Sequence, residues 1–165
     1  MTSQKKILDR AALAKEVARR RQAGQRMVFT NGCFDLIHVG HVRYLAAARR
    51  LGDYLVVALN ADDSVGRLKG PGRPILPQSQ RERIMASLAA VDYVTSFAED
   101  DPIALLRLLR PETLVKGGDY GVDGVVGREV IWEYGGQVQT VAPTQGASTH
   151  NLIQRVLEIH DALAR

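Results

Sequence analysis

The sequence predicts an α/β fold, in which a single domain is built on a doubly wound, parallel sheet of five strands. Three observations lead to this prediction. Short apolar runs alternate with segments of helical spacing along the chain, which is the pattern of parallel sheets with helices on both faces. Residues 54–59 are apolar throughout, as strands covered on both faces are. Finally, 165 residues suit one hydrophobic core, and no repeat or linker divides them.

Local signals predict the individual elements. Asp9 can cap a helix that ends before Gly24, and Pro111 ends a later helix. Helices are predicted over residues 9–21, 42–51, 78–90, 102–109, 126–134 and 148–164. Strands are predicted over residues 26–31, 54–59, 93–95, 113–115 and 137–141, and a Gly/Pro-rich loop over residues 69–77. We expect residues 1–25 to form an N-terminal helical segment packed on a domain of residues 26–165.

Composition and charge argue against several classes of protein. With 45% hydrophobic and 24% charged residues, the chain is not disordered, and no apolar run approaches the roughly 18 residues of a membrane span. The net charge is +4, and the densest basic runs, residues 19–21 and 49–50, are too short for a nucleic-acid patch. The first ten residues lack the apolar core of a secretory signal. Together with a single cysteine, Cys33, this predicts a cytoplasmic protein, and the mild positive charge is compatible with a small anionic substrate.

The segment that follows the first strand carries the clearest chemical signal. It reads TNGCFDLIHVGH over residues 30–41. Ligands of open α/β sheets bind beyond the carboxyl ends of the strands, where this segment lies. Neither a GxxxxGK[ST] loop nor a complete GxGxxG is present, which argues against a P-loop kinase and a hydride-transferring dehydrogenase. Instead, His38 and His41 lie where a loop enters a helix, and Gly40 between them lets the backbone approach a ligand.

Three explanations compete for His38 and His41. They can be structural residues, metal ligands, or donors of hydrogen bonds to a phosphate at the start of a helix. A metal site would lack the glutamate of the HExxH motif and a third His or Cys nearby. Together with Gly32, Asp35 and Gly40, the two histidines favour phosphate binding.

These residues resemble the signature of a known family. Residues 32–41, GCFDLIHVGH, are similar to the motif of the HxGH nucleotidyltransferase superfamily, whose Rossmann-like members transfer a nucleotidyl group onto a phosphate. Further segments narrow the resemblance to the adenylyltransferases of ADP-heptose synthesis: RLKG at 67–70, LVKGGDY at 114–120 and GAST at 146–149. The similarity runs from about residue 7 to residue 159, which is nearly the whole chain.

The resemblance implies a reaction. The expected enzyme transfers AMP from ATP to D-glycero-β-D-manno-heptose 1-phosphate and releases pyrophosphate, giving ADP-heptose for the lipopolysaccharide core. It would use Mg²⁺ on the triphosphate, few protein carboxylates and no covalent intermediate. Two alternatives stay open: a glycerol-3-phosphate cytidylyltransferase-like enzyme, and a nucleotide-binding module without catalysis. We expect no nucleic-acid or membrane partner, a homodimer as the favoured oligomer, and the sugar kinase of the pathway on a separate chain.

The resemblance also implies roles for individual residues. The catalytic set is His38, His41 and Lys69, with the two histidines at the α-phosphate of ATP and the lysine in a mobile loop. Nucleotide binding is implied for Asn31, Gly32, Cys33, Phe34, Gly40, Asp119, Gly146, Ser148 and Thr149. Substrate binding is implied for Asp35, Asn60, Asp62, Arg81 and Lys116, and no residue is assigned to a metal.

Simpler roles compete with several of these assignments. Lys69 can instead be a solvated surface lysine, and Ser148 with Thr149 can cap a helix. Asp119 can be a turn residue, and Arg81 can form a salt bridge on the surface of a helix. Cys33 is expected to be an unreactive thiol. His150 stands where the family has a threonine, so the third hydroxyl contact to the phosphates is in doubt.

Overall fold

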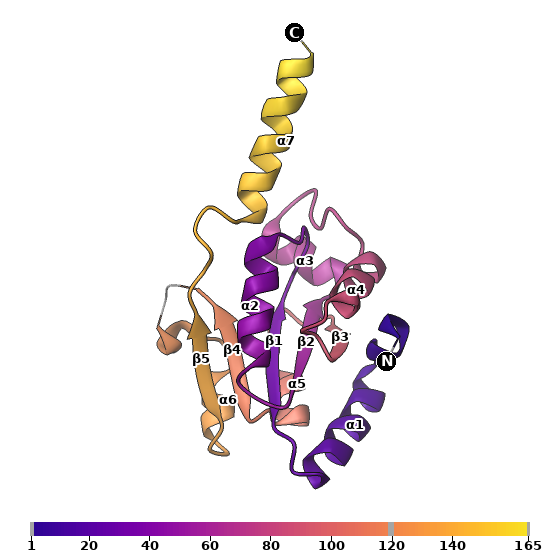
Figure 1. Ribbon diagram of the computed structural model, residues 1–165, viewed down its shortest axis with the longest axis vertical. Coiled ribbons are helices and arrows are strands. Elements are labelled where there is room, and N and C mark those ends of the chain that lie inside the picture. Colours follow the sequence, from indigo (N-terminus) through magenta and orange to yellow (C-terminus); the bar gives the residue numbers. More distant parts are fainter. Residues whose placement is uncertain (1, 119–120, 165) are drawn as a thin grey trace.

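The computed structural model describes residues 2–118 and 121–164. At its centre lies one five-stranded sheet, in which all described strand pairs are parallel and the order is β3-β2-β1-β4-β5. The strands are β1 (Met27–Gly32), β2 (Tyr54–Asn60), β3 (Tyr93–Phe97), β4 (Thr113–Gly117) and β5 (Gln137–Val141). Helices connect them (Figure 1), so the predicted doubly wound, Rossmann-like α/β fold is confirmed.

The helices lie on both faces of this sheet. Figure 1 shows α2 in front of the sheet and α5 and α6 behind it. The α-helices of the described residues are α1 (Arg10–Gln22), α2 (Val39–Arg49), α3 (Asp62–Lys69), α4 (Gln78–Ser87), α5 (Ile103–Leu109), α6 (Arg128–Trp132) and α7 (Thr149–Leu163). Short 3₁₀ turns, η1 and η2, cover Ser3–Lys6 and Val122–Gly124.

Two hydrophobic clusters enclose the sheet, because neighbouring residues of a strand point to opposite faces. In β1, Met27 and Phe29 pack with residues of α1, α5 and α6, whereas Val28 packs with residues of α2 and α4. β2 lies between β1 and β3 and is buried along its whole length. The apolar run predicted to be a strand is therefore covered on both faces, and the carboxyl ends of the strands are left to bind a ligand.

The N-terminal helix packs into the first of these clusters. Asp9 caps α1 as predicted, since its Oδ1 accepts a hydrogen bond from the N–H of Ala12 at 2.7 Å. Leu13 and Val17 lie one turn apart and are buried together against the sheet. The division of the chain at residue 25 stays a prediction.

Several predicted segments are wrong in extent: the helix expected over residues 42–51 covers Val39–Arg49, that over 78–90 covers Gln78–Ser87, and β3 and β4 each run two residues further than expected. The loop expected over residues 69–77 begins one residue later, because Lys69 is the last residue of α3. The sequence does not predict α3, since its eight residues bury only Ser64 and Val65 and are too few to show a helical period. The helix expected over residues 126–134 covers only Arg128–Trp132, because Gly127 precedes it with a left-handed φ of 91°.

α7 projects from the body of the molecule (Figure 1), and none of its 15 residues is buried. Its first turn contacts the HxGH segment, where Oγ1 of Thr149 donates to the carbonyl oxygen of Leu36. Despite its length, neither α7 nor any other helix of the described residues is long and apolar enough to cross a bilayer.

Candidate active site

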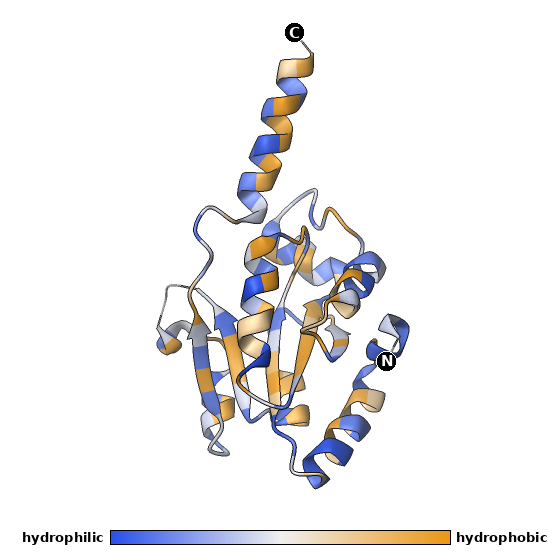
Figure 2. Ribbon diagram, in the orientation of Figure 1, coloured by the Kyte–Doolittle hydropathy of each residue, from blue (hydrophilic) through white to orange (hydrophobic). Residues whose placement is uncertain are grey.

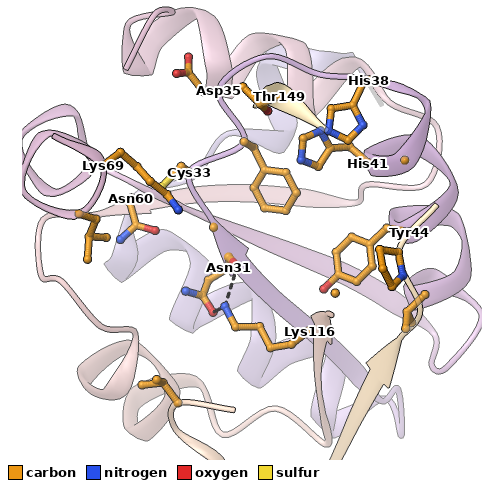
Figure 3. Close-up of a pocket in the computed structure, with 18 of the residues that line it drawn as sticks. Asn31, Cys33, Asp35, His38, His41, Tyr44, Asn60, Lys69, Lys116 and Thr149 are labelled. Carbon is orange, nitrogen blue, oxygen red and sulfur yellow. Dashed lines mark hydrogen bonds between the residues drawn. The ribbon is translucent and has the colours of Figure 1, made fainter. Parts of the chain in front are cut away.

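A cavity of about 790 Å³ lies beyond the carboxyl ends of β1, β2, β4 and β5. β1 and β4 pair with each other although they are not consecutive, so the winding of the sheet reverses between them, which is where open α/β sheets bind ligands. Figure 3 shows side chains from these strands and from α2 and α7 around one space. The predicted site residues that line it are Asn31, Gly32, Cys33, Phe34, Asp35, His38, Gly40, His41, Asn60, Lys69, Lys116 and Thr149.

His38 and His41 lie at the start of α2 with their rings stacked. The ring centroids are 3.9 Å apart and the planes differ by 28°. The ring of Phe34 lies 5.3 Å from that of His41, centroid to centroid. Gly40 makes this packing possible, because a Cβ at that position would lie 2.9 Å from Nδ1 of His38 and 3.2 Å from Cβ of Ala147. Any larger residue at position 40 would displace the His38 ring.

Burial favours the neutral form of both imidazoles. Burial lowers the pKa of His38, and burial, with a further contribution from His38, lowers the pKa of His41 to about 4. The buried Nδ1 atom of each ring has no hydrogen-bond partner among the described residues. Buried polar atoms without partners cost stability, and here both belong to rings that line the cavity.

Lys69 lines the same cavity from the side opposite the histidines (Figure 3). It ends α3, and Gly70 after it has a φ of 91°, which favours glycine. The expectation that Lys69 lies within a mobile loop is therefore wrong, because the residue lies at the end of a helix. The side chain extends from a helix end and is exposed, so rotation of the side chain alone can carry its ammonium to an anion in the cavity.

Asp35 holds the loop that follows Lys69. The buried carboxylate accepts hydrogen bonds from Nε of Arg73 at 2.7 Å and from the backbone N–H groups of Ile75 and Leu76 at 2.9 Å. Burial alone would raise the pKa of Asp35, but the hydrogen bonds from Leu76, Ile75 and Arg73 outweigh it and lower the pKa. With both oxygens engaged, the carboxylate anchors the loop, and its contact with a substrate stays a prediction.

Arg81 and Asp62 do not line the cavity, although both are predicted to bind substrate. The buried Arg81 side chain donates to the carbonyl oxygens of Leu76, Cys33 and Asn60, at 3.0, 2.6 and 2.9 Å. Its Nη2 also lies 2.7 Å from Oδ1 of Asp62. The guanidinium is thus a buried cross-link, not the partner of a surface salt bridge, and it positions the backbone of the HxGH segment at Cys33.

Lys116 and Asn31 form a separate polar group at the ends of β4 and β1. Nζ of Lys116 donates to Oδ1 of Asn31 at 2.8 Å and to its carbonyl oxygen at 3.0 Å (Figure 3). Burial lowers the pKa of Lys116 to about 8. Within residues 2–118 and 121–164, no carboxylate pairs with this ammonium, so its charge is available to an anionic ligand.

The start of α7 reaches the cavity through Thr149 and His150, whereas Gly146 and Ser148 do not line it. Ser148 is the N-cap of α7, which is the alternative role that the sequence analysis gives it. Oγ1 of Thr149 donates to the carbonyl oxygen of Leu36 at 3.4 Å, which connects the helix start to the HxGH segment. A helix N-terminus favours negative charge, so this side of the cavity suits phosphate groups.

Tyr44 is a cavity residue that the sequence analysis misses. Its Oη donates to the carbonyl oxygen of Val115 at 2.9 Å and lies 2.6 Å from Oγ1 of Thr30, so it connects α2 to β4 and β1. Helical spacing is the signal that could have found it, since Tyr44 follows Gly40 by four residues on the same face of α2. Asp119, which is predicted to bind nucleotide, lies outside the described residues.

Carboxylates in the cavity are poorly placed to be the main ligands of a metal ion. Among the described residues, no group of three or more His, Cys, Asp or Glu side chains could hold one. Of the residues that the structure describes, the carboxylates that line the cavity are Asp35, Asp100 and Asp101. Asp100 pairs with Arg67 at 2.7 Å, and Asp101 accepts a hydrogen bond from the N–H of Ile103.

The chain is similar to known proteins over most of its length. The model of a family described as cytidylyltransferase-like matches residues 29–155. The bifunctional protein HldE of Trichlorobacter lovleyi is 51% identical over 156 residues, which are 94% of this chain and 32% of that protein. HldE of Geobacter sulfurreducens is 52% identical over 155 residues, again 94% of this chain and 32% of the relative. The chain therefore spans about a third of the length of these relatives.

Solved structures share the fold. The crystal structure of the lipopolysaccharide core biosynthesis protein from Thermoplasma volcanium has a TM-score of 0.61 and 28% sequence identity. The match covers 75% of this chain and 100% of the Thermoplasma chain. A pantoate-β-alanine ligase from Francisella tularensis has a TM-score of 0.54 and 16% sequence identity, and the match covers 96% of this chain and 79% of the ligase. At this identity it shows a shared fold alone. Because the family model matches most of the chain, and HxGH residues from the matched range line one cavity, the chain belongs to the cytidylyltransferase-like family of nucleotidyltransferases.

Proposed function

We propose that this chain transfers AMP from ATP to D-glycero-β-D-manno-heptose 1-phosphate, giving ADP-heptose and pyrophosphate for the lipopolysaccharide core. The observation that carries the proposal is the single cavity lined by His38, His41, Lys69 and the start of α7. The similarity to HldE proteins, at 51% identity, and to a lipopolysaccharide core biosynthesis protein supports this choice of reaction. The sugar itself is inferred from the resemblance of the sequence motifs.

The triphosphate of ATP would lie between the histidine pair and Lys69. A neutral imidazole carries one N–H, so His38 and His41 can each donate a hydrogen bond to a phosphate oxygen without adding a charge. Lys69 and the N-terminus of α7 supply positive charge on other sides of the same space. Donors fixed in place before the reaction stabilise developing charge without reorganisation.

The sugar phosphate would bind on the side of the cavity formed by Lys116 and Asn31. The ammonium of Lys116 has only Asn31 oxygens as hydrogen-bond partners within the described residues, so a phosphate dianion would compensate its charge. This arrangement keeps the acceptor phosphate apart from Lys69, which would meet the leaving pyrophosphate.

The reaction follows from this placement of donor and acceptor. An oxygen of the sugar phosphate attacks the α-phosphorus of ATP in line, and the bond to the bridging oxygen breaks as pyrophosphate leaves. Positioning and charge stabilisation provide the catalysis, so no protein nucleophile is needed. Cys33 does not supply one, because burial raises the pKa of its thiol and disfavours the thiolate.

Mg²⁺ fits this cavity as an ion carried by the triphosphate. Mg²⁺ usually keeps several waters and takes phosphate oxygens with one or two carboxylates, which suits a cavity whose acidic residues are already hydrogen-bonded. When bound, it would offset the charge of the phosphates. We place the reaction in the cytoplasm, where ATP is available.

Pyrophosphate release tests the proposal. The enzyme is supplied with ATP, CTP, GTP or UTP, each combined with heptose 1-phosphate or glycerol 3-phosphate, and reactions without acceptor serve as controls. We expect the highest kcat/KM for ATP with heptose 1-phosphate. A preference for CTP with glycerol 3-phosphate would assign the chain to a cytidylyltransferase instead. Nucleotide binding without pyrophosphate release from any pair would indicate a non-catalytic module.

A further inference from the structure

Arg73 lines the cavity and carries hydrogen-bond donors that the described residues do not use. It belongs to the loop between α3 and α4, which is hydrophilic near α3 and hydrophobic toward α4 (Figure 2), and it lines the same space as Lys69. Nε of Arg73 donates to Oδ2 of Asp35 at 2.7 Å. Within residues 2–118 and 121–164, neither Nη1 nor Nη2 of Arg73 has a hydrogen-bond partner. Two N–H groups on each Nη atom can therefore bind a ligand.

Asp35 holds the guanidinium by one edge only. A carboxylate and an arginine often pair through two parallel hydrogen bonds. Here the backbone N–H groups of Ile75 and Leu76 occupy other acceptor positions of Asp35, at 2.9 to 3.0 Å. The Asp35 side chain is 1% exposed and the Arg73 side chain 23% exposed. The pair is thus anchored at its buried carboxylate, and the Nη atoms of Arg73 stay without a carboxylate partner in the described part of the chain.

Arg73 lies on the Lys69 side of the cavity. Asp35, which contacts it, and Lys116 lie far apart in Figure 3, with Lys69 between them in that view. Burial raises the pKa of the Cys33 thiol, and the positive charges of Lys69 and Arg73 oppose this shift. Both cations therefore act on the same point of the HxGH segment.

The start of α7 lies at the same end of the cavity. Oγ1 of Thr149 donates to the carbonyl oxygen of Leu36, the residue that follows Asp35, and Figure 3 shows Thr149 next to Asp35. A helix N-terminus and two cationic side chains thus face one part of the cavity, away from Lys116. This concentration of positive charge suits the outer phosphates of a nucleoside triphosphate, which carry most of its negative charge.

We propose that Arg73 is a further substrate-contacting residue, whose Nη atoms bind the β- and γ-phosphates of the triphosphate and then the leaving pyrophosphate. Asp35 is its positioning residue, because it orients the guanidinium before the ligand arrives. A fork of N–H donors matches two oxygens of a phosphate group, and donors already held in place lose less freedom on binding. The inference rests on the proposed function for the class of ligand, a nucleoside triphosphate, but not for the sugar or the base.

Binding of pyrophosphate tests this role without any acceptor. In isothermal titration calorimetry with Mg²⁺ present, Arg73→Met should weaken binding of pyrophosphate and of ATP by about 10–100-fold, which corresponds to one or two charge-assisted hydrogen bonds. The control Arg83→Met removes an exposed arginine from α4 and should leave both affinities within about twofold of those of the unsubstituted chain. Unchanged affinity for pyrophosphate in Arg73→Met would overturn the proposal and leave nucleotidyl transfer intact. An unsubstituted chain that binds neither ligand would overturn both.

Hydrogen exchange separates a ligand contact from a role in holding the loop. Asp35 keeps the N–H groups of Ile75 and Leu76 as donors when Arg73 is replaced. We therefore expect these two amides to exchange at the same rate in ligand-free Arg73→Met as in the unsubstituted chain. Weaker binding of pyrophosphate together with faster exchange at both amides would assign the loss to the loop, and would overturn the proposed contact.

A double-mutant cycle tests the positioning role of Asp35. Asp35→Asn keeps the size of the side chain but removes the charge that orients Arg73. If Asp35 acts through Arg73, Asp35→Asn should weaken pyrophosphate binding in the unsubstituted chain and add little in the Arg73→Met background. Losses of affinity that simply add in the double variant would show that Asp35 acts by another route, and would overturn its assignment as the positioning residue.

Discussion

The rings of His38 and His41 stack with their centroids 3.9 Å apart, and in the described part of the chain neither Nδ1 atom has a hydrogen-bond partner. Burial, followed by the proximity of His38, lowers the pKa of His41 to about 4. Burial also lowers the pKa of His38, so both shifts favour the neutral imidazole. The pair is better described as two fixed hydrogen-bond donors at the start of α2, which is what a phosphate requires.

Removal of one of these donors should slow the reaction without unfolding the protein. His41→Ala is expected to lower kcat by about 10²–10³-fold, the usual cost of losing one donor to developing charge. The control is His160→Ala, which removes an exposed histidine from α7. Steady-state kinetics and circular dichroism check both variants. A folded His41→Ala enzyme with near-normal kcat would leave His41 a structural residue.

Lys69→Ala should lower kcat by more than it raises KM for ATP. The charge that Lys69 meets grows on the leaving pyrophosphate, so its interaction is stronger in the transition state than in the ground state. Lys69→Arg should restore little activity, because a guanidinium fork does not replace a point charge. If only KM for ATP changes in Lys69→Ala, the lysine contributes to ground-state binding alone.

The pKa of Lys116 predicts an alkaline limit on use of the sugar phosphate. The pKa is lowered from 10.5 to about 8, so raising the pH through 8 removes the proton and the positive charge. We expect kcat/KM for the sugar phosphate to fall above pH 8, with little change in KM for ATP. In Lys116→Arg this fall should move to higher pH, since arginine stays charged. An identical alkaline limb in both enzymes would show that another group causes it.

Arg81→Met should destabilise the fold by about 3 kcal/mol. The change leaves the carbonyl oxygens of Cys33 and Asn60 without their buried, charged donor, and the half-exposed carboxylate of Asp62 without its ion-pair partner. Urea unfolding measures the loss. The matched control is Arg83→Met in the same helix, where the exposed side chain should change stability by less than about 0.5 kcal/mol. Equal losses of unfolding free energy in the two variants would contradict the role of Arg81 as a buried cross-link.

The sequence predicts the sheet well, because residues 54–59 of β2 are apolar and segments of helical spacing separate the strands. The first and last α-helices also begin at recognisable caps, since the side chains of Asp9 and Ser148 each accept the expected backbone hydrogen bond. α3 escapes prediction because only Ser64 and Val65 of its eight residues are buried. That omission also misplaces Lys69, which ends a helix instead of beginning a loop.

The site is predictable where the motif itself lines the cavity, as it does from Asn31 to His41. It is not predictable where distant segments meet. Arg81 forms its cross-link with residues up to 48 positions away in the chain, and no local pattern records those contacts. Nor does the sequence show that Lys116 and Asn31, 85 positions apart, share a hydrogen bond at adjacent strand ends. Both groups depend on strand order, which local signals do not determine.

Identification of the products tests the central claim most directly. ³¹P nuclear magnetic resonance of a reaction that contains ATP, Mg²⁺ and heptose 1-phosphate reports which phosphorus is attacked. The account predicts ADP-heptose and pyrophosphate in equal amounts, both greatly reduced when His41→Ala replaces the unsubstituted enzyme. ADP together with a sugar bisphosphate would show attack at the γ-phosphorus, and would contradict nucleotidyl transfer at this site.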